Sequence, residues 1–127
     1  MTDFKIEILH LLETALPEME QRIQAGAVDE RTATPFAVYT VPEETPVRTL
    51  SGIAGYVTTF EITFYDNRYA SVEQLRHRAI AALEGAKIDG KYCRYKSSST
   101  EYFPDCDLHS VTPVSYTHLT LPTNSLV

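Results

Sequence analysis

The chain has 127 residues, of which 43% are apolar and 22% are charged, and its 17 acidic and 11 basic side chains give a net charge of −6. This length predicts one domain with a core that needs neither disulfides nor metal, and the acidic balance argues against direct binding of nucleic acid or anionic membranes. Without a membrane-length apolar run or a signal peptide at the N-terminus, we expect a cytoplasmic protein.

The first predicted element is a helix. Thr2 or Asp3 can cap its start, and Pro17 cannot continue its hydrogen-bond ladder, so it ends near Leu16. Its apolar residues recur at helical spacing: Phe4, Ile8, Leu11, Leu12 and Ala15. Ile6 and Leu9 widen this stripe.

Three extended segments are predicted next. Residues 22–25 are compatible with a short strand, and residues 35–41 form a strand by their β-branched and aromatic content. Pro42 and Pro46 exclude a central strand, so we expect residues 42–55 to be a long hairpin arm or a loop.

The most regular pattern covers residues 56–66, where apolar and polar side chains alternate. A period of two predicts a strand with one packed face. The face predicted to point into the core consists of Tyr56, Thr58, Phe60, Ile62 and Phe64.

A second helix is predicted from a capping box formed by Ser71 and Gln74 to a C-terminal Gly85. Asp89-Gly90 then indicates a hairpin turn before a strand over 91–97, which residues 97–100 interrupt, and a final strand begins at Leu108. The order helix, strand, strand, helix, strand, strand predicts the α+β class. We expect an antiparallel sheet of about four to five strands with both helices on one face.

The C-terminal stretch from Val114 to Thr123 resembles a translated sequencing adapter, the transposon end used in library preparation. Residues 114–127 also contain no Lys, Arg, Asp or Glu. We therefore expect a single domain over 1–113, truncated at its C-terminus, followed by a non-native tail over 114–127. The −6 charge then belongs to the first 113 residues.

The sequence offers few groups for chemistry. Cys93, Cys106 and His109 are too few for a four-ligand zinc site, and no nucleophile turn accompanies Cys106 and His109. The carboxylate pairs, at 43–44 and at 105 and 107, are typical of solvated surface charge. We expect no catalytic residue, no metal and no cofactor, and hence no enzyme.

Two surface features are candidates for an interface. Arg68, Arg76 and Arg78 form a basic patch, which is otherwise a solvated helix face, and it could meet Glu43 and Glu44 of a neighbouring subunit. Tyrosines on the strands, such as Tyr39 and Tyr65, could give the second sheet face amphipathic rings suited to a protein contact. The alternative is half-exposed cross-strand pairing.

The order of these segments resembles the tail completion, or tail terminator, proteins of long-tailed bacteriophages and prophages. The sequence motif is mainly Thr34–Tyr39, within the Pro-aromatic strand entry 33–39, and the order and spacing of the other segments, such as a strand at 59–65 and a helix from Ser71, extend the resemblance over residues 3–113. It implies a homo-oligomeric ring, usually hexameric, which caps the tail tube and joins it to the head, without active site or cofactor. Its partners would be tail tube and head–tail connector proteins, in the host cytoplasm during assembly and then in the virion tail.

Two other hypotheses stay open at this stage. One is a small dimeric α+β domain that binds a ligand or regulates a partner. The other is a small enzyme that uses Cys106 and His109.

Overall fold

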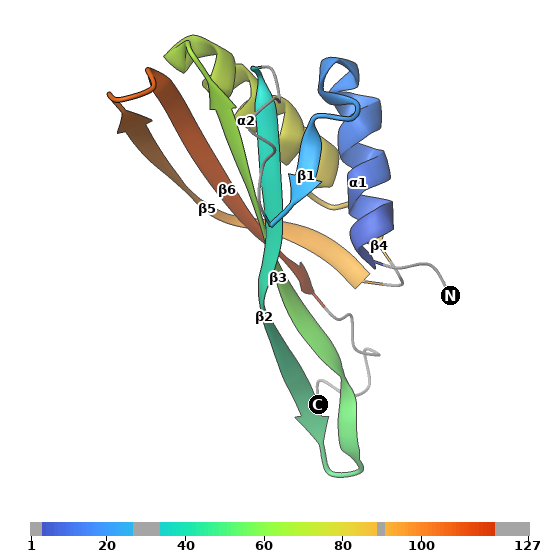
Figure 1. Ribbon diagram of the computed structural model, residues 1–127. Helices are drawn as coiled ribbons and strands as arrows, with labels where there is room; N and C mark the ends of the chain where they lie inside the picture. The colour runs from blue at the N-terminus through green and yellow to red at the C-terminus, as the bar shows by residue number, and fades with distance from the viewer. Residues whose placement is uncertain (1–3, 27–33, 89–90, 119–127) are drawn as a thin grey trace.

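A computed structural model describes residues 4–26, 34–88 and 91–118. Figure 1 shows a twisted sheet with both helices on one face. In chain order the elements are α1 (Phe4–Ala15), the 3-10 turn η1 (Pro17–Met19), β1 (Ile23–Ala25), β2 (Phe36–Thr49), β3 (Gly52–Asp66), α2 (Tyr69–Leu83), β4 (Lys87–Ile88), β5 (Lys91–Phe103) and β6 (Leu108–His118).

The sheet has the strand order β1-β2-β3-β6-β5-β4 within the described residues. The α+β class and the placement of both helices on one face are confirmed. The expected strand number is too low, because β1 and β4 are edge strands of only three and two residues. The expected antiparallel pairing is wrong at one edge: β1 runs parallel to β2, with Ile23 beside Ala37.

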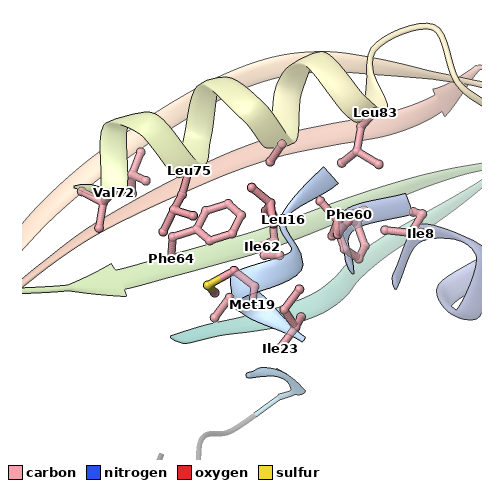
Figure 2. Packing of buried hydrophobic residues seen from close by; sticks show 14 of the residues in the cluster. Ile8, Leu16, Met19, Ile23, Phe60, Ile62, Phe64, Val72, Leu75 and Leu83 are labelled. Atoms are coloured by element: carbon pink, nitrogen blue, oxygen red, sulfur yellow. The ribbon is translucent and has the colours of Figure 1, made fainter. Parts of the chain in front are cut away.

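The core lies between the helices and the inner face of the sheet, where α1, α2 and β3 bring their apolar side chains together (Figure 2). The predicted core face of β3 is confirmed from Thr58 to Phe64. Tyr56 is the exception, with 40% of its surface exposed, because it lies on the part of β3 that pairs with β2 alone, before the pairing with β6 begins at Thr59.

The helix ends show one correction. Helix α1 ends at Ala15, as Pro17 predicts, while its expected caps Thr2 and Asp3 lie outside the described residues. The capping-box prediction is wrong: α2 begins at Tyr69, so Ser71 lies inside the helix, where its hydroxyl donates a hydrogen bond to Asp66.

The other end of α2 agrees with its predicted stop. Gly85 directly follows the C-cap residue Glu84 and has a φ of +78°, a conformation that glycine adopts without strain. The predicted turn at 89–90 lies outside the described residues, between β4 and β5.

The last two strands are longer than expected. Residues 97–100 do not interrupt β5, because a register shift between Tyr95 and Ser97 absorbs the irregularity. Strand β6 continues past Pro113 to His118 and pairs with β3 on one side and β5 on the other. The first part of the predicted tail, 114–118, therefore lies inside the sheet, and residues 119–127 lie outside the described part of the chain.

Candidate interaction surfaces: an arm, an uncovered sheet face and a groove

The predicted hairpin arm is present. Within the described residues, β1 pairs with β2 only as far as Tyr39, and β6 pairs with β3 only as far as Thr59. Residues 43–57, here called the arm, therefore form a two-stranded ribbon that Figure 1 shows projecting away from the helices. The ribbon tolerates Pro42 at a register shift and Pro46 on a free edge, which are the places where a strand accepts proline.

The arm carries apolar side chains into solvent. Leu50 at the tip is fully exposed, Ile53 is 50% exposed and Tyr56 is 40% exposed. Arg48 pairs across the ribbon with Ile53, so it places a positive charge beside this apolar tip. A two-stranded ribbon with no core of its own is marginally stable in water, so contact with another surface would stabilise it.

The acidic pair lies at the base of the arm. Glu43 and Glu44 are both exposed, and as neighbours on one strand they point to opposite faces of the ribbon. At most one of them can face a given flat partner surface.

The three candidate arginines are not gathered into one patch. Arg76 forms an ion pair with Glu73 at 2.8 Å, while Arg78 forms one with Glu18 at 2.6 Å and also donates to the carbonyl of Ala15 at 2.9 Å. Residues two apart on a helix point to different sides. Arg78 therefore ties α2 to the end of α1, and its hydrogen bond to Glu18 lowers the pKa of that carboxyl. Arg68 is exposed at the N-terminus of α2.

The two candidate tyrosines lie on opposite faces of the sheet. Tyr39 points toward the helices, where its ring stacks on Phe60 with centroids 5.8 Å apart and packs against the core. Tyr65 lies on the uncovered face, where its ring contacts Phe36 at 4.9 Å and Phe103 at 6.2 Å. Burial raises the pKa of Tyr65. The prediction of aromatic rings on the second face therefore fits Tyr65 and not Tyr39.

The cysteines and His109 do not form a centre. Cys93 is buried near the start of β5, whereas Cys106 is exposed beyond its end, roughly 30 Å away along an extended strand. Burial raises the pKa of the Cys93 thiol to about 11. The ring of His109 packs between Tyr69 and Tyr102. In residues 4–26, 34–88 and 91–118, no three His, Cys, Asp or Glu side chains are placed to hold a metal ion.

A groove of about 650 Å³ lies beside α1, and the sequence did not predict it. Its lining residues come from α1, the end of α2 and β4: Ile6, Glu7, His10, Leu11, Thr14, Ala15, Ala82 and Lys87. Ile6 was assigned to the apolar stripe of the helix, yet half of its surface is exposed. The position of Ile6 at the edge of the apolar stripe was the one feature of the sequence that pointed to this groove.

Of the comparisons with known proteins, only the one with solved structures found a match. No family model matches the chain, and no curated protein matches its sequence. Among the helices that the structure describes, none is long and apolar enough to cross a membrane. A solved chain described as "Virion of native gene transfer agent (GTA) particle" is similar in structure, with a TM-score of 0.68, 87% of this chain and 89% of that chain covered, and 11% sequence identity. At this identity the likeness shows a shared fold.

Proposed function

We propose that this protein is a structural subunit of a phage-like particle, acting as a tail completion or terminator protein. Copies form a ring, expected to be hexameric, that caps the tail tube and joins it to the head. The observation that carries the proposal is the likeness to a virion chain over nearly the whole length of both chains. The order and spacing of the sequence segments led to the same class of protein independently.

The arm supports an assembly role. It exposes apolar side chains on a ribbon that lacks a core, which is a feature of surfaces that bind other proteins. A ring needs two different patches on each subunit, because each copy meets its neighbours head to tail. An arm on one side and a receiving surface on another would satisfy this requirement, and no step requires catalysis, a metal or a cofactor.

For the contact between subunits, we keep the predicted pairing of Glu43 and Glu44 with Arg68, Arg76 and Arg78 of the next copy. Arg76 and Arg78 already hold acidic partners within the subunit, so Arg68 is the residue best placed to receive a neighbour's carboxylate. Tyr65, on the uncovered face, is better placed for a contact than Tyr39.

The proposal is tested by electron microscopy of particles made from the gene cluster that encodes the chain. An early stop codon at Glu7 should leave separate heads and tails, or tails of irregular length, and a plasmid copy should restore joined particles. Normal particles in the stop mutant would overturn the proposal. Native mass spectrometry of the purified protein gives the ring size, and a size other than six would correct that part alone.

A second candidate is the small dimeric ligand-binding domain. The groove beside α1 favours it, because its volume and its mixed lining of apolar and polar side chains suit a small molecule. The ligand-binding hypothesis predicts a dimer whose Tm rises when a ligand binds in the groove, whereas the ring proposal predicts a larger assembly.

A further inference from the structure

We propose that the tip of the arm of one copy inserts into the groove beside α1 of the next copy. This inference deepens the ring proposed above and rests on it for the number of copies. The groove of one molecule would bind the apolar tip of the arm, Leu50 and Ile53, of a second molecule.

The two surfaces match in polarity. Leu50 is fully exposed and Ile53 half exposed on the arm, and the groove offers Ile6, Leu11 and Ala15 as an apolar floor. Burying such side chains against each other is favourable, at about 25 cal/mol per Å² of apolar surface removed from water. Leu11 and Ala15 also pack partly against the core of their own subunit, whereas Ile6 in the groove and both tip residues expose half or more of their surface.

The groove is lined by one acidic side chain, Glu7, and also by His10 and Lys87, so a charge match with the arm is local to Glu7. Arg48 lies on the arm directly across from Ile53, and Glu7 lines the groove. With the tip inserted, the guanidinium can reach the carboxylate at the rim. At a partly desolvated rim this pair mainly sets the register of the contact.

The length of the arm from its acidic base to its tip also matches the length of α2. Glu43 and Leu50 are roughly 23 Å apart along an extended strand. Arg68 and Ala82, at the two ends of α2, are roughly 21 Å apart along a helix. An arm lying along α2 of the neighbour can therefore place its tip in the groove and one of its two carboxylates near Arg68 at the same time.

The arm cannot fold back into its own groove. It continues strands β2 and β3 of the sheet, and Figure 1 shows it leading away from the helices. The contact is therefore between molecules, and it is heterologous, because an arm meets a groove and not another arm. Such contacts close into rings or continue as filaments.

The test uses two variants of the full chain, each lacking one half of the contact. Leu50→Asp removes the apolar tip but keeps the groove, and Thr14→Trp fills the groove but keeps the arm. Both positions are exposed, so neither change disturbs the core. Each variant alone should associate on the order of tenfold to a hundredfold more weakly than the unmodified chain in analytical ultracentrifugation.

The decisive sample is an equal mixture of the two variants. One intact arm and one intact groove remain between them, so the mixture should form a one-to-one pair and nothing larger. Glu20→Trp and Thr100→Asp place the same side chains on exposed positions away from both surfaces, and should leave assembly unchanged. A mixture that stays monomeric, an unmodified chain that does not associate, or a Leu50→Asp variant that assembles normally would each overturn the inference.

A charge exchange provides an independent check. Arg48→Glu and Glu7→Arg should each weaken association several-fold, and the double variant should recover most of the loss. No recovery would refute the assigned register. These measurements use the purified chain, so their outcome is independent of particle microscopy. The arm–groove contact can be confirmed although the protein is not a tail component, and it can be refuted although the protein is a tail component.

Discussion

Thr117 should be a determinant of stability in spite of its position in the last strand. Its hydroxyl accepts a hydrogen bond of 3.1 Å from the backbone N–H of Thr58, and the two residues are 1% and 8% exposed. Thr117→Val keeps the shape of the side chain but removes the acceptor. A buried N–H left without a partner costs about 1–3 kcal/mol. Thr117→Val should therefore lower the free energy of unfolding by that amount, although valine is the more apolar residue.

The assay is urea denaturation followed by circular dichroism, supported by thermal melting. For a domain of this size the loss corresponds to a decrease in Tm of roughly 3–6 °C per kcal/mol. Thr117→Ser retains the hydroxyl and should recover much of the stability. Thr112→Val is the matched control, because the hydroxyl of Thr112 contacts that of Thr63 at 2.9 Å on the uncovered face, where water can replace it.

A neutral or stabilising Thr117→Val would refute the reasoning. It would mean that the hydroxyl is not needed at this point of β6, and that residues 114–118 do not hold the position that the structure gives them. The experiment therefore also tests whether the segment predicted as a non-native tail contributes to the fold.

Three further predictions concern single side chains. Arg78→Met should lower stability by less than about 1 kcal/mol, because its ion pair with Glu18 is exposed. The pKa of Glu18 is lowered in the folded state, so the part of the loss that comes from the ion pair should be complete above pH 4.5 and disappear as the pH falls through the folded pKa. Urea titrations at several pH values measure this dependence. A thiol reagent at pH 8 should modify Cys106 rapidly and Cys93 only after unfolding, because burial raises the pKa of Cys93 to about 11; equal native rates would contradict the buried position. Phe64→Ala should destabilise the fold by about 3–5 kcal/mol in denaturant titrations, as is typical of a large core side chain, and a change below 1 kcal/mol would place Phe64 outside the core.

The elements with a strong local pattern could be predicted from the sequence. The alternation over 56–66 identified β3 and its core face, and the apolar stripe of α1 and the glycine after α2 placed both helices. These features depend on neighbours a few residues away. The start of α2 was predicted at the capping box of Ser71 and Gln74, but the helix begins two residues earlier, at Tyr69.

The candidate site depends on segments that are distant in sequence, and for that reason it was only partly predictable. Arg78 looked like free surface charge, but it binds Glu18, sixty residues away. Tyr39 looked like a partner of Tyr65, but the pleat of neighbouring strands places them on opposite faces. The groove requires α1, α2 and β4 to meet, and no local pattern encodes that meeting.

The four central strands of the sheet are two hairpins, β2–β3 and β5–β6, which are joined where β3 meets β6. Each hairpin can form from nearby residues, but the seam between them pairs Thr59 with Tyr116 and must wait for the last described strand. Closing such a distant pair is the slow step expected in folding. While the chain is still being synthesised, the edge of β3 stays open, and chains emerging side by side on one messenger RNA can pair through it. Slower initiation of translation should therefore raise the yield of correctly folded protein.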